Sequence, residues 1–371
     1  MSVKNIAYFI TSHGFGHATR AAAVMEAILS IDPDTQFHVF STVPTWLFQE
    51  TLDRDISYQE TLVDVGLSQK NSLEEDLDQT IQRLDNLLPY STGLIDDLAD
   101  QVTRQSCQLV ICDIAPLGIA VAQAAKIPSL LIENFTWDWI YGGYLDSLNP
   151  QLKPKLNSHS AYLKKWFGQA DFHVQTSPIC NPSSSAHLKT NPISRKRKSE
   201  TAEIRDRLKI PLDTKVVLIT MGGIPWDFDF LTQLKCSSDT LLLIPGGSDQ
   251  IIRQNNLLTL PHQSGYYHPD LINAADAVIG KVGYSTIAEV YQAGVPFGYI
   301  SRPQFKESKY LVQFIQQQMQ GIPIKEELLA SGNLQTELKK LLQLPRINRD
   351  KTNGADEVAR YIVDQVLKTR S

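Results

Sequence analysis

The sequence predicts an α/β protein of two domains, each built around a parallel β-sheet. Its 371 residues exceed what one ordinary core needs, since domains average roughly 150 residues. Short apolar runs alternate with helical patterns along both halves, which favours parallel sheets covered by helices on both faces. In each half a strand ends in a glycine-containing turn that opens a helix, at Gly14 and at Gly280. Ligands of such sheets bind outside the carboxyl ends of the strands.

The apolar periodicity places the elements of each half. In the first half, residues 1–180, it predicts strands at 5–11, 36–41, 108–113 and 129–133, helices at 18–30 and 119–126, and one or two helices within 73–101. Prolines, serines and the basic run Arg195–Lys198 indicate a linker at 181–200. In the second half, residues 201–350, it predicts strands at 215–221, 240–245, 276–280 and 297–300 and helices at 285–293 and 307–319, before a C-terminal helix within 351–371.

Charge and composition exclude several classes of function. The formal net charge of -5 argues against nucleic acid as a partner, because nucleic-acid binding relies on an excess of lysine and arginine. We interpret the basic run Arg195–Lys198 as a solvated linker, with contact to anionic lipid or a polyphosphate as the alternative. The four cysteines lack metal-ligand spacing and are too few to crosslink the chain, which favours a reducing, cytoplasmic compartment.

No membrane-spanning or secretory segment is expected. The longest apolar stretch, residues 109–132, contains Asp113, Lys126 and two prolines, which do not suit a bilayer span. The chain passes from Met1 into an apolar strand without the basic, apolar and small-residue regions of a signal peptide. Any membrane contact is therefore expected to be peripheral.

The first glycine turn offers a candidate catalytic histidine. Gly14 and Gly16 let the backbone turn sharply into a helix, whose first amides and positive dipole end face a ligand. His17 begins this helix, and a neutral imidazole there can accept a proton from an acceptor hydroxyl. The alternative is that His13 and His17 cap or pack the turn. The turn lacks the third glycine of a dinucleotide fingerprint and the Lys-Ser/Thr end of a P-loop.

The second glycine turn suits a pyrophosphate. Gly283 precedes Ser285 and Thr286, which open a helix, so that backbone amides and hydroxyls converge there. Lys281 adds positive charge, and Glu289, one helical turn after Ser285, is placed to accept hydrogen bonds from ribose hydroxyls. The alternative is an ordinary N-cap at Ser285, with Glu289 as an exposed helix residue.

Two further loops follow strands of the second half and are expected at the same carboxyl edge of its sheet. Gly222 and Gly223 follow the first strand of the second half and would offer backbone amides to phosphate oxygens. The loop Arg302–Glu307 follows a later strand, where polar side chains would hold sugar hydroxyls. A simple turn and a surface loop are the alternatives. Asp227–Asp229 has the Asp-x-Asp form of a metal site, but its aromatic flanks and the availability of helix ends argue against a metal, and no cofactor is predicted.

These segments resemble the GT-B glycosyltransferases related to the UDP-GlcNAc-dependent enzyme that completes the peptidoglycan lipid intermediate. They also resemble the glycosyltransferase-like N-terminal region of plant L-arabinokinases, in the runs Gly14–Arg20 and Asn134–Asp138. The resemblance covers nearly the whole chain, and its most specific part extends from Gly280 through Glu289 to Glu307. It implies the GT-B fold, with two Rossmann-like domains whose parallel sheets face a central cleft.

The resemblance also implies roles for individual residues. On the donor side, the diphosphate is assigned to Gly222, Gly223, Ser285 and Thr286, the ribose to Glu289, and the transferred sugar to Gln304 and Glu307. Lys281 and Gly283 complete this predicted donor site from the turn itself. His17 matches the histidine of the family's glycine loop, a candidate base, and Asp113, at a strand end, would orient it or else cap a helix. Glu133, Asn134 and His13 would line the acceptor side.

Together these features predict a transferase that needs no metal. It would move a sugar from a nucleotide-sugar, with a UDP-sugar favoured, to a hydroxyl of a small-molecule, glycan or lipid-linked acceptor. The alternatives are an epimerase of the same fold, which acts without an acceptor, and a non-catalytic protein that binds a nucleotide-sugar or glycan. Nothing in the chain resembles the kinase region of L-arabinokinases, so phosphorylation of arabinose is not expected. The aromatic segment Phe135–Tyr141 would form an acceptor platform or, as we favour, ordinary packing.

Overall fold

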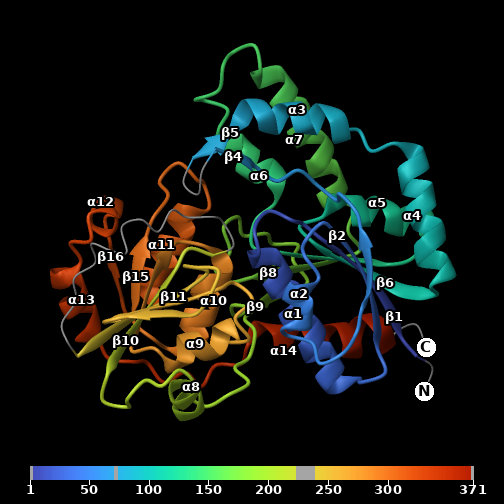
Figure 1. The fold of residues 1–371 in the computed structure, drawn as a ribbon. Coiled ribbons are helices and arrows are strands. Elements are labelled where there is room, and N and C mark those ends of the chain that lie inside the picture. The colour runs from blue at the N-terminus through green and yellow to red at the C-terminus, as the bar shows by residue number, and fades with distance from the viewer. Residues whose placement is uncertain (1–2, 71–73, 223–238, 369–371) are drawn as a thin grey trace. The chain divides into compact units, whose positions relative to one another are not determined.

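The chain folds into two compact α/β units. The computed structural model describes residues 3–70, 74–222 and 239–368 (Figure 1). The first unit comprises residues 1–194 with 305–307 and 352–371, and the second comprises residues 195–304 with 308–351. Each unit contains one large, predominantly parallel sheet, as the sequence predicts.

The first unit is built on a seven-stranded sheet in which each pair of neighbouring strands is parallel. The strand order is β3-β2-β1-β6-β7-β8-β9. The strands are β1 (Asn5–Ile10), β2 (Gln36–Ser41), β3 (Ser57–Glu60), β6 (Cys107–Asp113), β7 (Ser129–Glu133), β8 (Phe172–Thr176) and β9 (Leu188–Thr190). A separate antiparallel pair joins β4 (Ser68–Gln69) and β5 (Glu75–Asp76).

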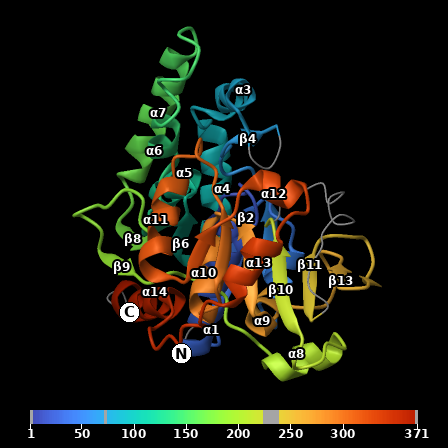
Figure 2. The same ribbon diagram turned by 90° about the vertical axis from the view of Figure 1, so that its left-hand side faces the viewer.

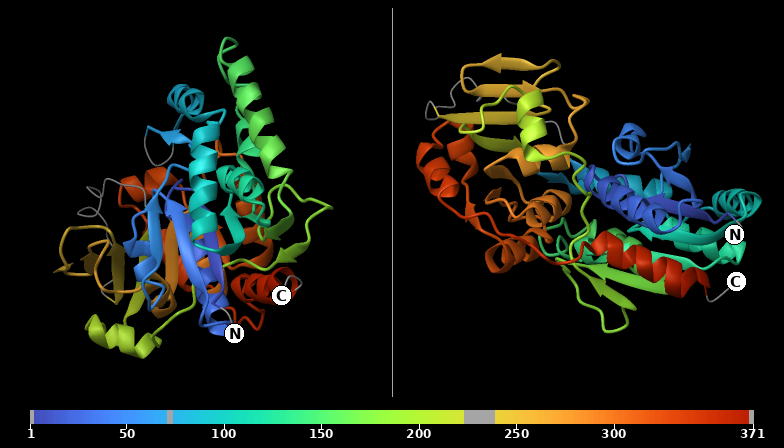
Figure 3. Two further views of the ribbon diagram at one scale, coloured as in Figure 1. Left: turned by 90° about the vertical axis from the view of Figure 1, so that its right-hand side faces the viewer. Right: turned by 90° about the horizontal axis from the view of Figure 1, so that it is seen from below.

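Helices cover both faces of this sheet. They are α1 (Gly16–Ile31), α2 (Trp46–Gln49), α3 (Leu77–Leu87), α4 (Thr92–Arg104), α5 (Pro116–Ala125), α6 (Trp137–Gly142), α7 (Lys153–Phe167) and α14 (Gly354–Tyr361), which continues as a π-helix over Ile362–Leu367. The blue α1 and the red α14 lie side by side and share one core with Tyr8 and Ile10 of β1 (Figures 1 and 3). The C-terminal segment therefore belongs to the first unit.

The order of the strands creates a switch point between β1 and β6. The chain leaves β1 for β2 on one side, and β6 adds on the other side with Ile10 in register with Asp113. The amide of Thr11 donates to the carbonyl of Asp113 over 3.2 Å. At such a point the two adjacent loops diverge and leave room for a ligand. The turn after β1 and the end of β6 therefore lie together.

The second unit repeats this plan. Its strand order is β12-β13-β11-β10-β14-β15-β16, parallel except for the antiparallel pair β12 and β13. The strands are β10 (Lys215–Thr220), β11 (Thr240–Pro245), β12 (Ile252–Gln254), β13 (Leu257–Leu260), β14 (Ala277–Lys281), β15 (Phe297–Ile300) and β16 (Gly321–Pro323). Thr220 pairs with Gly280, so the switch point lies between β10 and β14.

The second sheet lies between helices (Figure 2). Two hydrophobic cores join it to them. One core contains residues of α8 (Thr201–Arg207), α9 (His268–Ala274), α10 (Tyr284–Ala293) and α11 (Ser308–Gln318). The other contains residues of α12 (Glu326–Ala330) and α13 (Gln335–Leu342). Val216 and Leu218 of β10 belong to the first core and Val217 to the second, which is the alternation expected of a strand between two layers.

The predicted linker contains more structure than its composition indicates. β9 lies inside 181–200 and adds to the first sheet, and the boundary between the units falls after Ser194. The expectation of a fully solvated basic run is wrong at its first residue, because Arg195 is buried whereas Lys196 to Lys198 are exposed. Within the described residues, no helix combines the length and the apolar character that crossing a bilayer requires.

Gly294 ends α10 in a conformation that demands glycine. Its φ is +68°, and a Cβ there would lie 1.8 Å from the carbonyl oxygen of Ile347. We predict that Gly294→Ala lowers the free energy of unfolding by at least about 1–2 kcal/mol, the cost of the left-handed backbone alone. Gly168→Ala is the matched control, since Gly168 ends α7 with φ -71° and ordinary contacts. Urea unfolding of both variants tests this, and equal stabilities would refute it.

Candidate active site

The turn after β1 places His17 on the carboxyl edge of the first sheet. Gly14 adopts a φ of +70°, which lets the chain reverse into α1, and His17 is the second residue of that helix. The side chain of His17 is buried, at 7% exposure. The helix was predicted to begin at His17, and it begins one residue earlier, at Gly16.

His17 and Asp113 form a buried pair, as the sequence predicts for a base and its partner. Nδ1 of His17 lies 2.9 Å from Oδ1 of Asp113, whose side chain is fully buried. Arg20, one turn along α1, donates through Nε and Nη2 to the two carboxylate oxygens. Burial by itself raises the pKa of Asp113, but the charge and hydrogen bonds of Arg20, with the hydrogen bond from His17, hold this pKa below its usual value.

The hydrogen bonds assign the tautomer of His17. An ionised Asp113 can only accept, so Nδ1 of His17 carries the proton in their 2.9 Å contact. Nη2 of Arg20 lies 3.1 Å from the same nitrogen, but with Nδ1 protonated these two donors do not bond each other, and both donate to Oδ1 of Asp113. The lone pair of the ring is left on Nε2. Burial lowers the pKa of His17 and outweighs the opposing effect of Asp113, so the imidazole is neutral at pH 7.

Two residues predicted for different substrates meet in the first unit. Asn134, predicted on the acceptor side, donates through Nδ2 to Oε1 of Glu307 over 2.7 Å. Glu307, predicted to hold the transferred sugar, is buried at 4% exposure and belongs with Phe305–Glu307 to the first unit. Glu133 lies at the end of β7, buried, and Oε1 of its carboxylate accepts from Gln175 and contacts His173.

His13 packs against Trp137, which in turn binds a buried carboxylate, Asp64, that sequence reasoning missed. Its ring packs edge-on against Trp137, at 5.1 Å between centroids, and its Nδ1 accepts from the amide of Leu67. Trp137 is fully buried and donates through Nε1 to Asp64, which also accepts from Thr11. Burial raises the pKa of Asp64 to about 7, against the opposing effect of these two hydrogen bonds. Trp137 therefore serves packing, the favoured interpretation of the aromatic segment.

The phosphate residues predicted in the second unit lie at its switch point. The side chain of Lys281 reaches to 4.0 Å from the position of a Cβ on Gly222, whose φ is +71°. α10 begins at Tyr284, so the N-cap is Gly283 and not Ser285. Ser285 is partly exposed in the first turn, next to Thr286, which is buried at 8% exposure. The first amides of any helix lack a partner within the helix, and the positive end of the helix dipole favours an anion there.

Glu289 is buried, contrary to the alternative that it is an exposed helix residue. Its Oε1 accepts from Nε of Arg195 over 2.7 Å, and its Oε2 lies 2.8 Å from Nδ1 of His268. Burial by itself raises the pKa of Glu289, but the charge of Arg195 and the hydrogen bond and charge of His268 lower it to about 2. His268 also contacts Thr220, at the end of β10, over 3.3 Å. The role in ribose binding stays a prediction.

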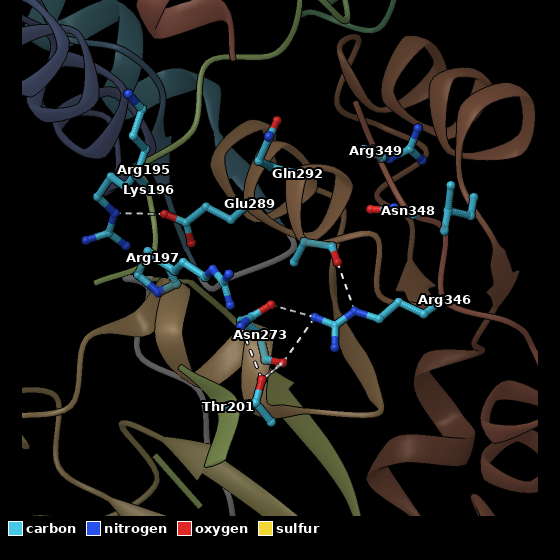
Figure 4. A pocket seen from close by; sticks show the side chains of 13 residues that line it. Arg195, Lys196, Arg197, Thr201, Asn273, Glu289, Gln292, Arg346, Asn348 and Arg349 are labelled. Carbon is cyan, nitrogen blue, oxygen red and sulfur yellow. Dashed lines mark hydrogen bonds and ion pairs between the residues drawn. The ribbon is translucent and has the colours of Figure 1, made fainter. Parts of the chain in front are cut away.

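A cavity of about 580 Å³ adjoins Glu289 in the second unit (Figure 4). Its lining residues are Arg195, Lys196, Arg197, Thr201, Pro269, Asn273, Glu289, Gln292, Ala293, Arg346, Ile347, Asn348 and Arg349. Arg346 donates to the carbonyls of Ala293 and Asn273, at the ends of α10 and α9. Cations at helix C-termini stabilise the helix dipoles. Arg346 therefore has a structural role, and the residues of α10 that line the cavity, Glu289, Gln292 and Ala293, lie beyond its first turn.

The structure leaves the other predicted residues without a tested role. Gln304 is exposed and belongs to the second unit, whereas Glu307 belongs to the first. Gly223 and Asp227–Asp229 lie outside the described residues, so that part of the predicted phosphate turn and the Asp-x-Asp motif stay predictions. Arg195 and His268 were missed because neither lies in a glycine turn.

No family model matches the chain. Among curated proteins, L-arabinokinase of Arabidopsis thaliana is 25% identical over 368 residues, which cover 97% of this chain and 34% of that protein. The chain thus spans about a third of the length of this relative. The resemblance to the arabinokinase stated above is confirmed. The resemblance to the peptidoglycan lipid-intermediate transferase stays a prediction.

Solved structures of similar fold are glycosyltransferases. The calicheamicin glycosyltransferase CalG4 has a TM-score of 0.59 at 12% identity, covering 100% of this chain and 95% of that one. UGT89C1 of Arabidopsis thaliana, complexed with UDP, has a TM-score of 0.57 at 12% identity, covering 97% and 99%. The chain has the GT-B fold. UGT2 of Phytolacca americana, complexed with UDP-2fluoro-glucose and pterostilbene, has a TM-score of 0.58 at 14% identity, covering 99% of this chain and 94% of that one.

Proposed function

We propose that this GT-B protein is a glycosyltransferase that moves a sugar from a nucleotide-sugar to a hydroxyl acceptor. The favoured donor is a UDP-sugar, in keeping with the UDP and UDP-2fluoro-glucose bound in two structures of similar fold. The acceptor is a small molecule, a glycan or a lipid-linked hydroxyl. The observation that carries the proposal is the buried pair of His17 and Asp113 at the switch point of the first sheet.

The pair supplies the proton transfer that the reaction needs. The acceptor oxygen forms a bond to the anomeric carbon while the bond from that carbon to the donor phosphate breaks. The hydroxyl proton passes to Nε2 of His17, and the electron pair of the broken bond leaves on the nucleoside diphosphate. Asp113 holds the imidazole through Nδ1 and stabilises the imidazolium that forms.

The second unit supplies the charge that receives the diphosphate. The first-turn amides of α10, the backbone at Gly222 and the ammonium of Lys281 offer hydrogen bonds and positive charge at one switch point. Positive charge from these groups replaces the divalent cation that other transferases use, and we propose a metal-independent reaction.

A thermal-shift panel of nucleoside diphosphates tests donor binding. We expect UDP to raise the melting temperature of the full chain, because a ligand at 100 times its Kd stabilises by about 2.7 kcal/mol. Lys281→Met should reduce the shift without abolishing it, and the exposed Lys325→Met should leave it unchanged. No shift with any nucleoside diphosphate, at concentrations up to several millimolar, would contradict the proposed donor site.

A further inference from the structure

A continuous chain of buried polar groups links Glu307 to His17 in the first unit. Glu307 accepts from Asn134, whose Oδ1 accepts from Nη1 of Arg20 over 2.8 Å. Arg20 pairs with Asp113, and Asp113 accepts from His17. The exposure of these five side chains lies between 0% and 7%. Groups linked this way inside a protein polarise one another and hold a single geometry.

We infer that Arg20 and Asn134 are positioning residues that couple the base His17 to the carboxylate of Glu307. This inference rests on the proposed function and deepens it. It assigns to Glu307 an effect on the protonation and orientation of His17, in addition to the sugar contact predicted from sequence. Arg20 reaches none of the reacting atoms through its described contacts and acts through Asp113.

Arg20 is needed because Asp113 is fully buried. A carboxylate removed from water favours its protonated form unless a cation compensates. The guanidinium of Arg20 contacts both oxygens of Asp113 and keeps the group ionised. A protonated Asp113 could donate to Nδ1 of His17 and move the ring proton to Nε2, where it would block proton acceptance. Arg20 therefore sets which nitrogen of His17 is basic.

The side-chain amide of Asn134 can take only one orientation between Arg20 and Glu307. A guanidinium has donors and no acceptor, so the amide atom that faces Arg20 is Oδ1. A carboxylate only accepts, so the amide atom that faces Glu307 is Nδ2. The backbone carbonyl of Asn134 accepts from the amide of Cys180, which fixes the main chain at this position. The amide orientation of Asn134 is therefore determined by both neighbours.

The position of Glu307 gives this coupling a consequence for the reaction. Glu307 ends the loop predicted to hold the transferred sugar, and its carboxylate is the far end of the chain from His17. Removing its negative charge should weaken the hydrogen bond from Asn134 and lower the basicity of His17. A sugar hydroxyl bound at Glu307 would act on the same hydrogen bond. The chain therefore makes the base responsive to the group predicted to hold the donor sugar.

The test is an NMR titration of His17 in the full chain without substrate. We expect the wild-type ring to be the Nδ1-protonated tautomer and Glu307→Gln to lower the pKa of His17 by about half a unit, as coupling within one network predicts. In a protein that already carries Asn134→Ala, Glu307→Gln should shift the pKa of His17 by less than half as much. Glu133→Gln, which removes a buried charge held by other partners, controls for effects through space. Equal Glu307→Gln shifts with and without Asn134 would overturn the coupling.

Arg20→Lys adds a second readout. Lysine keeps the charge but loses the bidentate contact, so we expect a mixture of His17 tautomers and a turnover about 10²-fold lower, with the donor KM unchanged. If this variant does not fold, the Glu307 and Asn134 variants still test the coupling, because they leave the Arg20 and Asp113 pair intact. An unchanged tautomer in a folded Arg20→Lys protein would refute the role of Arg20. The titrations need no transfer activity, so their outcome is separate from that of the proposed function.

Discussion

Replacing His17 by alanine is expected to lower the transfer rate by about 10²- to 10⁴-fold, the contribution typical of a general base. Nε2 of His17 is the proton acceptor of this pair. Arg20 cannot replace it as a base, because a guanidinium only donates hydrogen bonds and this one is bound to Asp113. Donor binding is expected to persist, since the residues proposed to bind the phosphates belong to the second unit. Turnover measured at saturating donor separates the two effects.

The same replacement at His262 is the matched control. His262 is exposed in the second unit, and His262→Ala should retain full turnover. The pH profile adds a second check: burial holds the pKa of His17 below 6.5, so wild-type kcat/KM should be level above pH 6.5 and fall only at lower pH, where the ring gains a proton. A His17→Ala protein with wild-type turnover would remove the base from the mechanism.

Replacing Glu289 by glutamine is expected to cost about 3 kcal/mol of folding free energy at pH 7. The pKa of Glu289 falls from 4.5 to about 2 on folding, and each unit corresponds to about 1.36 kcal/mol. The substitution also leaves Arg195 and His268 beside an uncharged amide, and breaking one partner of a buried pair is strongly destabilising. Urea unfolding of the purified full chain measures the loss.

The stability difference between wild type and Glu289→Gln should depend on pH. A depressed carboxyl pKa contributes stability above 4.5 that is lost as the pH falls from 4.5 through about 2. The difference between wild type and Glu289→Gln should therefore narrow as the pH falls below 4.5. Glu327→Gln, at an exposed position of α12 in the same unit, should leave the stability within about 0.5 kcal/mol. A Glu289→Gln protein as stable as the Glu327 variant would contradict the buried pair.

Much of the fold follows from apolar periodicity, because central parallel strands are buried on both faces. The strands at 36–41, 129–133, 240–245 and 297–300 have the predicted bounds. Among the strands that escaped prediction, β3, β9 and β16 lie at sheet edges and are short, and Tyr58 and Gln59 of β3 are only partly buried. Short strands at a sheet edge carry a weak apolar pattern and depend on their neighbour for order.

The candidate site was predictable where the position of a residue at the end of a strand is enough to place it. His17 and Asp113 each follow a buried strand, and parallel strands bring their carboxyl ends to one edge. Arg20 escaped prediction because an arginine in a helix is normally exposed, although its position three residues after His17 places it on the same face. Asp64 lies after β3 in a stretch without periodicity, and only the tertiary fold shows that it is buried and accepts from Trp137 and Thr11.

The most direct measurement is product analysis of the wild-type chain incubated with UDP-sugars and a panel of hydroxyl acceptors. We predict that an acceptor gains the mass of one sugar for each UDP released, and that this product falls by at least 10²-fold in His17→Ala. UDP released at the same rate without any acceptor would instead indicate the epimerase. Donor binding with no UDP released under any condition would indicate a binding protein, and either result would contradict a transferase based on His17 and Asp113.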